Sequence, residues 1–243
     1  KRLNSTTNTE TLATGQAIAY LGCQWWAGDR TLGGYYSGFR VVQGEAVYGS
    51  SSTLTMPTQP VTDTSNTSIL SNFTNVGIFD HTMKNNLETV NNTRIRTDVK
   101  QLNTGSIYFD GSSDELNIND TKSDTFYFGT GKFTIEAFIR VESTSGSQGQ
   151  WFTNEGHGGW GTGGIAIYLQ SAITVWFNDY NASSSFMSYD GNYDDGVMRH
   201  FVIVRGTSGA CAIFVNGTRV ATGTHTGNVG RTGGMGIGAY KGI

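Results

Sequence analysis

Two stretches of alternating apolar residues near the end of the chain constrain its fold more than any other feature. Residues 199–205 read Arg-His-Phe-Val-Ile-Val-Arg, and residues 211–221 read Cys-Ala-Ile-Phe-Val-Asn-Gly-Thr-Arg-Val-Ala. Alternating β-branched and aromatic residues are typical of β-strands. Asn216-Gly217 interrupts the second stretch, and this pair favours the two-residue type I′ turn of a β-hairpin. The sequence therefore predicts consecutive antiparallel strands closed by a tight turn.

Other stretches follow the same alternation. Residues 133–140 read Phe-Thr-Ile-Glu-Ala-Phe-Ile-Arg, so every second residue from Phe133 is apolar and one face of the strand is uniformly apolar. Glu136 is the only acidic residue of the opposite face, and we interpret it as a solvated, outward-facing side chain. Further strands are predicted at residues 17–22, 35–42, 164–169 and 173–177.

The predicted strand at residues 35–42 reads Tyr-Tyr-Ser-Gly-Phe-Arg-Val-Val. Regular alternation places one set of its side chains on one face, namely Tyr36, Gly38 and Arg40. The other face then carries Tyr35, Phe39 and Val41. A β-bulge would change this assignment, since one extra residue reverses the faces.

Composition and charge narrow the class of protein. The chain of 243 residues has 34 Gly, 2 Pro and 14% charged residues, against about 25% charged residues in average globular chains. This composition favours an all-β protein of a virion or of the extracellular space. A net charge of -3 provides no basic field, so nucleic acid is not an expected partner. No apolar run approaches the roughly 20 residues of a membrane helix, so no membrane insertion is expected.

The hairpin at residues 199–221 resembles the signature hairpin of concanavalin A-like, laminin-G-type jelly rolls. Residues 106–111, Ser-Ile-Tyr-Phe-Asp-Gly, are similar to an early strand and turn of that family. Residues 34–60 resemble the run that closes laminin-G-like modules of bacteriophage structural and tail proteins, with a proline-bearing linker after it. The resemblance implies an all-β fold, an antiparallel jelly-roll β-sandwich.

The resemblance also implies a division of the chain. Residues 1–60 would be the closing strands of a preceding, swapped or permuted laminin-G-like module plus a linker, and residues 61–243 a sandwich that lacks its last strand. A short repeat relates residues 19–22 to residues 239–242. Either the chain is a window of a tandem array, or its early strands fold against its later ones, in the same chain or in a neighbour. Donor-strand exchange between copies would generate a fibre.

Catalytic chemistry is not expected. Retaining glycoside hydrolysis requires two carboxyl groups about 5 Å apart, which alternate positions of one strand would supply. No predicted strand carries such a pair, and the four histidines are scattered. His200, beside Arg199, is interpreted as a structural residue at a strand edge, with a metal or catalytic role as the alternative. We therefore expect a protein that is not an enzyme.

Calcium is the cofactor to consider. Residues 190–195 read Asp-Gly-Asn-Tyr-Asp-Asp and place oxygen ligands at alternate positions, as hard cations require. The candidate metal ligands are Asp190, Asn192 and Asp194, with Asp179 as an addition from a neighbouring loop. The loop lacks the glutamate of an EF-hand, and the alternative interpretation is a solvated polar turn.

Aromatic residues in or beside glycine-rich loops are the candidate ligand-binding residues, because such rings can stack on the apolar face of a sugar. The set comprises Trp25, Trp26, Trp151, Trp160, Tyr180 and Tyr193. The alternative is that these rings fill the ends of the sandwich, since Trp seldom stays fully exposed. Trp176, in the middle of a predicted strand, is interpreted as a packing residue. The two cysteines, Cys23 and Cys211, are interpreted as buried thiols, with a disulfide between them as the alternative.

These observations favour a non-enzymatic structural and adhesive module of a virion appendage or extracellular fibre. Its partners would be copies of itself or other structural subunits, and a host surface glycan. The alternative is a secreted calcium-dependent glycan-binding lectin. A glycosidase would require the carboxyl pair that the predicted strands lack.

Overall fold

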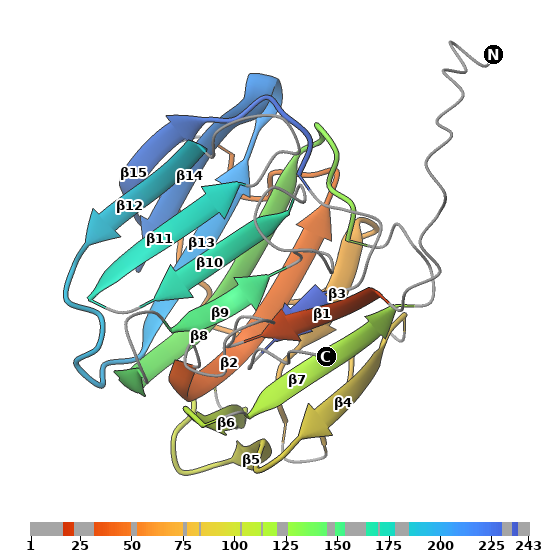
Figure 1. The fold of residues 1–243 in the computed structure, drawn as a ribbon, viewed down its shortest axis with the longest axis vertical. Helices are drawn as coiled ribbons and strands as arrows, with labels where there is room; N and C mark the ends of the chain where they lie inside the picture. The colour runs from red at the N-terminus through yellow and green to blue at the C-terminus, as the bar shows by residue number, and fades with distance from the viewer. Residues whose placement is uncertain are drawn as a thin grey trace.

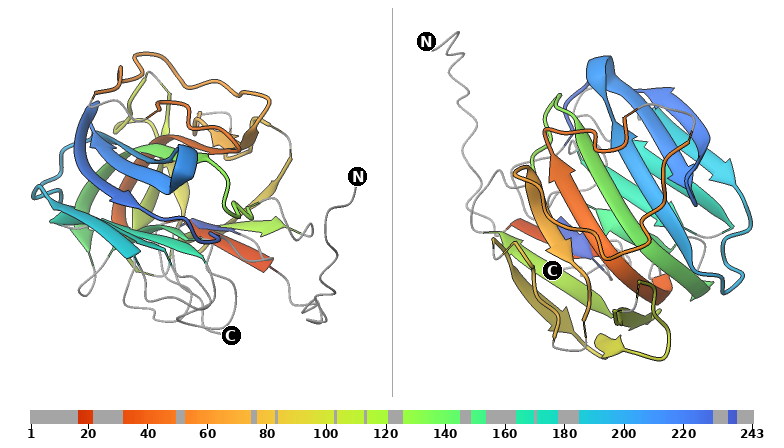
Figure 2. Two further views of the ribbon diagram at one scale, coloured as in Figure 1. Left: turned by 90° about the horizontal axis from the view of Figure 1, so that it is seen from above. Right: turned by 180° about the vertical axis from the view of Figure 1, so that it is seen from behind.

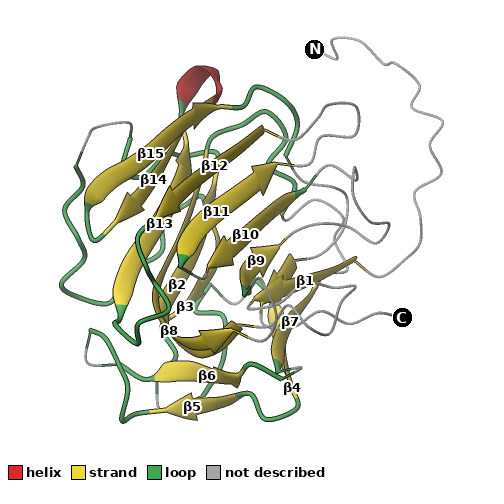
Figure 3. Ribbon diagram, turned by 60° about the vertical axis from the view of Figure 1, so that its left-hand side comes forward, coloured by secondary structure: helices red, strands yellow, loops and turns green. Residues whose placement is uncertain are grey.

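Two β-sheets are stacked face to face in the computed structural model of this chain (Figure 1). The structure describes residues 17–21, 32–49, 53–74, 77–82, 84–102, 104–112, 114–120, 126–144, 149–153, 164–169, 171–177, 185–229 and 235–237. Figure 3 shows that strands dominate the described residues, with the short 3₁₀ helix η1 at Thr207–Gly209. The described residues contain no helix of the length and hydrophobicity needed to cross a membrane.

The front sheet, which faces the viewer in Figure 1, has eight strands. Its order is β12 (Ser185–Asp190), β11 (Ala172–Phe177), β10 (Ile165–Leu169), β9 (Gln150–Thr153), β1 (Ala17–Leu21), β16 (Met235–Ile237), β7 (Glu115–Asp120) and β4 (Asn86–Val90). Neighbours pair antiparallel except β1 and β16, which pair parallel. Both of these strands also pair with β7, where Leu21 and Ile237 each lie opposite Leu116.

The back sheet also has eight strands. Its order is β15 (Thr218–Thr224), β14 (Ala210–Val215), β13 (Arg199–Arg205), β8 (Phe133–Thr144), β2 (Leu32–Gln43), β6 (Ser106–Asp110) and β5 (Arg94–Arg96), with β3 (Thr67–Ser71) paired to β2. Every pairing in this sheet is antiparallel, which confirms the predicted fold class of an antiparallel β-sandwich. The Asn216-Gly217 turn between β14 and β15 has positive φ angles of 48° and 82°, as a type I′ turn requires.

The main hydrophobic core lies between the two sheets. The alternating residues predicted from the sequence fill it from the back sheet, and Ile135, Ile203 and Ile213 are fully buried there. Ile167 of β10 and Val175 of β11 fill it from the front sheet. Each fully buried aliphatic side chain of this kind stabilises the fold by about 1.5–3 kcal/mol relative to an exposed one.

Strand β2 lies in the middle of the back sheet, between β8 on one side and β6 and β3 on the other. Residues 32–42 are buried throughout, because neighbours cover both faces and both edges of this strand. Residues of the early part of the chain thus fold between later strands of the same chain. The division of the chain near residue 60 stays a prediction.

A β-bulge at Gly38 corrects the predicted faces of β2. The pairing of β2 with β8 shifts register between Ser37 and Arg40, and Gly38 has a positive φ of 63°. The extra residue reverses the alternation, so Tyr36 lies in the core with Phe39 and not on the face of Arg40. The expectation of Tyr36 and Arg40 on one face is therefore wrong.

The connector, which we define as residues 44–66 and of which residues 44–49 and 53–66 are described, covers the part of the back sheet's outer face formed by β8, β13 and β14. Figure 2 shows it crossing this face as a wide loop between β2 and β3. Ala46, Tyr48 and Leu54 pack on a second hydrophobic cluster, whose buried members are Val202, Val204, Ala212 and Phe214. The backbone N–H of Leu54 donates to the carbonyl of Gly217 over 2.7 Å. A Cβ at Gly217 would lie 2.6 Å from the Leu54 carbonyl oxygen, so this close approach requires glycine.

Candidate functional site

The structure describes two of the six candidate aromatic residues. Trp151 of β9 is fully buried and Tyr193 is 5% exposed, and both belong to the main core. The prediction that these two rings face solvent is wrong, because they fill the space between the sheets. The other four lie outside the described residues, as does the predicted metal ligand Asp179. They are Trp25, Trp26, Trp160 and Tyr180.

The predicted calcium loop follows β12 directly. Asp190, Asn192 and Asp194 are all exposed. The backbone N–H groups of Gly191 and Tyr193 both donate to the carbonyl of Ser171, at 3.1 and 3.2 Å, which clamps the loop onto the turn before β11. A Cβ at Gly191 would lie 2.3 Å from the Tyr193 ring, so the ring requires glycine at this position. Burial raises the pKa of Tyr193 to about 12.

The next carboxylate of this loop is already engaged. The guanidinium of Arg199 donates to both oxygens of Asp195, at 2.6 and 2.7 Å, and these hydrogen bonds lower the pKa of Asp195 to about 2. Among the residues that the structure describes, no three His, Cys, Asp or Glu side chains form a group that could hold a metal ion. Because Asp179 lies outside them, the calcium site stays a prediction.

A different surface gathers groups suited to a sugar, on the outer face of the front sheet. We call it the Trp176 face, comprising Thr174, Trp176, Ser188 and Asp190, and it lies beside Tyr168, which is only 4% exposed. In β11 the side chains of Ile173, Val175 and Phe177 enter the core, so Trp176 points away from it and is half-buried. Trp176 is therefore a partly exposed residue of a sheet surface, and the interpretation of it as a packing residue is only half correct.

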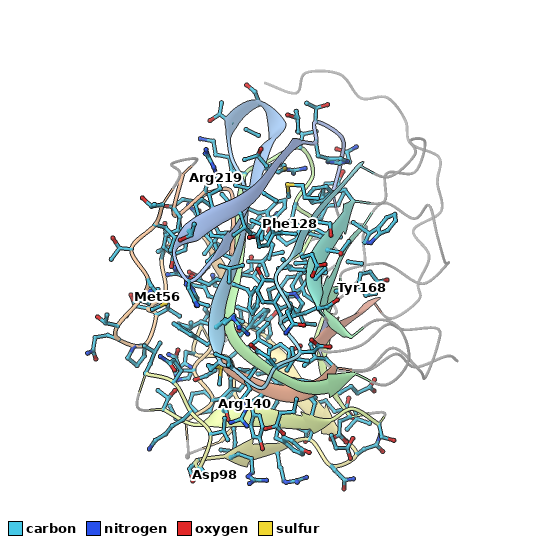
Figure 4. All side chains as sticks on the ribbon, turned by 90° about the vertical axis from the view of Figure 1, so that its left-hand side faces the viewer. Met56, Asp98, Phe128, Arg140, Tyr168 and Arg219 are labelled. Atoms are coloured by element: carbon cyan, nitrogen blue, oxygen red, sulfur yellow. The ribbon has the colours of Figure 1, made fainter. Side chains whose placement is uncertain are left out.

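Cross-strand pairing fixes the other members of the Trp176 face. Thr174 lies opposite Tyr168 of β10 on one side and opposite Ser188 of β12 on the other. The Thr174 Oγ1 and Ser188 Oγ atoms are 3.1 Å apart, within hydrogen-bonding distance. Asp190 follows Ser188 by two residues and shares its face. Figure 4 shows Tyr168 on this side of the molecule, opposite Met56 of the connector.

A buried polar cluster on the back sheet corrects two further interpretations. Glu136 of β8 is fully buried, and His200 of β13 is 1% exposed. The Glu136 carboxylate accepts hydrogen bonds from Arg40 Nε at 2.6 Å, from His200 Nε2 at 3.0 Å and from the Tyr48 hydroxyl. Arg40 Nη1 also donates to the Thr62 carbonyl over 2.8 Å, so the cluster ties both ends of the connector to the sheet.

The electrostatics of the cluster keep Glu136 ionised. Burial opposes its charge and raises its pKa, but the hydrogen bond from His200, the positive charge of Arg40 and the hydrogen bond from Tyr48 outweigh burial and hold the pKa below its usual range. Burial and the adjacent Glu136 charge raise the pKa of Tyr48, so its hydroxyl stays a donor. The interpretation of Glu136 as solvated is wrong, because the connector covers this face. His200 has a structural role, but in the sheet interior and not at an edge.

Cys211 is a free, buried thiol, 4% exposed, and burial raises its pKa to about 11. It therefore behaves as a small core residue and not as a nucleophile. Cys23 lies outside the described residues.

Comparisons with known proteins agree with this fold. The family model for laminin-G domains of the concanavalin A-like lectin/glucanases superfamily matches residues 109–242, more than half of the chain. Neither the curated proteins nor the solved structures gave a match. The matched stretch includes β8, β13 and β14 of the back sheet and β9 to β12 of the front sheet. The chain belongs to the concanavalin A-like lectin/glucanase superfamily, with a domain of the laminin-G type.

Proposed function

We propose that this protein is a non-enzymatic, adhesive β-sandwich that binds glycans, as a module of a virion appendage or extracellular fibre. Its binding surface is the Trp176 face. The observation that carries this proposal is the half-exposed indole of Trp176 beside a pair of hydroxyl groups on the same sheet surface. Indole rings offer an apolar platform to the C–H face of a sugar ring, and hydroxyls exchange hydrogen bonds with sugar hydroxyls.

The geometry of the Trp176 face suits a small saccharide. Residues two apart on a strand are about 6.6–6.8 Å apart. The spacing of Trp176 and Thr174 on β11 is therefore comparable to the size of one sugar unit. Ser188 and Asp190 extend the polar part of the surface along β12. Strands of a packed sheet hold these side chains rigidly, which lowers the entropy cost of ordering them around a ligand.

The buried cluster supports a role without catalysis. Glu136 is the only acidic residue of the predicted strand at residues 133–140, and a glycosidase needs a carboxyl group that reaches substrate. Here the Glu136 carboxylate lies beneath the connector and accepts hydrogen bonds from Arg40, Tyr48 and His200. Glu136 therefore stabilises the fold and is shielded from any substrate.

The edges of the two sheets bear on how copies of the protein would assemble into a fibre. Figure 1 shows the front sheet ending at β4 and the back sheet ending at β5, on the same side of the molecule. Strand β5 is three residues long and two of them are arginines. Short and charged edges are features by which natural sheets resist pairing with other strands. Contacts between copies would therefore depend on the loops more than on these edges.

A glycan array tests the proposed function. The wild-type protein is expected to bind a subset of neutral glycans, and Trp176→Ala should lose that binding at least tenfold. Tyr127→Ala is the control, since Tyr127 is an exposed aromatic residue, 36% exposed, in the segment before β8, where its carbonyl accepts a hydrogen bond from Gln43 of the back sheet. Binding that survives Trp176→Ala would contradict the assignment of the surface. Loss of binding on adding a chelator would favour the calcium-dependent lectin.

A further inference from the structure

We propose that the outer face of the back sheet carries a second binding site, for an acidic polysaccharide with carboxylate groups. The arginine–tyrosine row forms it, which we define as Arg94, Arg96, Tyr108, Tyr35 and Arg140. The row shares with the proposed function the premise that the protein binds glycans, but it uses other residues and another sheet. The two sites would let one module bridge two different glycans.

The register of four strands builds the row. Arg94 of β5 lies opposite Tyr108 of β6, Tyr108 lies opposite Tyr35 of β2, and Tyr35 lies opposite Arg140 of β8. Directly opposed residues point to the same face, so these four side chains stand in line across the sheet. Neighbouring strands are about 4.8 Å apart, and the row therefore spans about 14 Å.

Cation–π contacts hold the guanidinium groups in place. The Arg94 guanidinium carbon lies 4.7 Å from the centre of the Tyr108 ring, and that of Arg96 lies 5.7 Å from the same ring. The Arg140 guanidinium lies 5.5 Å from the Tyr35 ring, and the two tyrosine rings lie 4.9 Å apart. Side chains that are ordered before binding lose less entropy when a ligand arrives. The tyrosines are therefore positioning residues for the cations.

The charges of the row fit carboxylates. Arg96 forms an ion pair with Asp98, and Arg140 forms one with Glu142. Both guanidinium groups are therefore placed to bind a carboxylate. Asp98 is 57% exposed and Glu142 is 38% exposed. Exposed ion pairs contribute little net stability, so a ligand carboxylate can replace either partner. Arg94 forms no ion pair with any residue that the structure describes.

The chemistry of the partner follows from this pattern. Planar guanidinium groups bind carboxylates through two parallel hydrogen bonds, and three of them on one face favour a polymer with repeated carboxylates. With the paired Asp98 and Glu142 counted, the three guanidinium groups leave a local charge of +1 on a chain whose net charge is -3. Figure 4 shows Arg140 and Asp98 at one end of the molecule, far from Arg219 at the opposite end.

Calorimetric titration with oligogalacturonate, compared with a neutral dextran oligomer, tests the proposal. The wild-type protein should bind the uronate with an affinity that falls as salt screens the charges, whereas any binding of the dextran at the Trp176 face should not depend on salt. The double variant Arg94→Gln and Arg140→Gln should bind about tenfold more weakly, which corresponds to about 1.4 kcal/mol at 25 °C. Arg219→Gln, on β15 at the other edge of the same sheet, should bind as the wild type does.

A second pair of variants separates binding from a structural role of the row. Asp98→Asn with Glu142→Gln removes the two internal carboxylates, and the uronate should then bind about threefold to tenfold more tightly. Asp63→Asn with Glu88→Gln changes the net charge equally at exposed positions outside the row and should leave the affinity unchanged. A purely structural row predicts no gain in either variant.

The outcomes distinguish this proposal from the proposed function. Trp176→Ala should leave uronate binding intact, and the arginine variants should leave neutral glycan binding intact. Absence of uronate binding by the wild-type protein overturns the second site. So does equal or tighter binding of polyglutamate, since the row would then recognise acidic peptides and not a sugar chain.

Discussion

The buried carboxylate of Glu136 allows the sharpest test of how the fold is held together. Glu136→Gln preserves the size of the side chain but removes its charge. Arg40, 6% exposed, would then keep its positive charge without a carboxylate partner in the interior. Breaking a buried ion pair by removing one partner costs about 3–5 kcal/mol, because an uncompensated buried charge remains. Domains of this kind have a total stability of about 5–15 kcal/mol, so the loss is a large share of it.

Urea unfolding followed by fluorescence measures this loss. With a urea m-value of about 2–3 kcal/mol/M, a change of about 4 kcal/mol lowers the unfolding midpoint by about 1.3–2 M. Glu142→Gln is a matched control, because it is the same substitution on the same strand at an exposed ion pair, which contributes less than about 1 kcal/mol. Equal midpoints for the two variants would show that burial does not make the Glu136 ion pair important for stability.

Three further predictions concern the connector and its anchors. The pKa of Glu136 is lower in the folded protein than in the unfolded chain. Its contribution to the free energy of unfolding is therefore present above a pH of about 4.5 and is lost as the pH falls through the folded pKa. Measuring stability against pH should show this loss in the wild type and not in Glu136→Gln. Tyr48→Phe removes the hydroxyl that donates to Glu136, so limited proteolysis should cut the connector faster while β8 keeps its protection in hydrogen exchange. Gly217→Ala should destabilise the protein by about 1–3 kcal/mol in thermal unfolding. The loss should exceed that of Gly49→Ala. Both glycines have a positive φ, but only a Cβ at Gly217 would clash with the Leu54 carbonyl oxygen.

Local alternation in the sequence predicts the strands of the back sheet well. The residues predicted to be apolar on β8, such as Ile135, are buried in the main core, and Asn216-Gly217 forms the predicted turn. These features depend on neighbours in the sequence, and the pattern therefore contains them. The bulge at Gly38 is different, because glycine permits a positive φ at many places without requiring one.

The environment of Glu136 could not be predicted from its own strand. Its face is covered by the connector, whose polar composition and two prolines are typical of a linker. Arg40, Tyr48 and His200 come from distant parts of the chain and meet Glu136 only after the sheets form. The arginine–tyrosine row could not be predicted for the same reason. Its members are distant in the sequence and lie opposite one another only through the register of four strands.

The exposure of three aromatic rings also differs from the prediction. Position in or beside glycine-rich loops favours solvent contact for Trp151 and Tyr193, but Trp151 of β9 and Tyr193 of the loop after β12 both pack into the core between the sheets. Trp176 had the opposite outcome, because strict alternation on β11 sends three neighbours inward and leaves the indole on the outer surface. That alternation is visible in the sequence and was the available signal for the Trp176 face.

We propose that the two sheets present two separate binding surfaces, and affinity measurements on two variants test this directly. Trp176→Ala and the double variant Arg94→Gln and Arg140→Gln would each be titrated with a neutral glycan identified on the array and with oligogalacturonate. Each variant should lose one ligand and keep the other. If one variant abolished both interactions, or if neither variant weakened either, the claim of two independent surfaces would be contradicted.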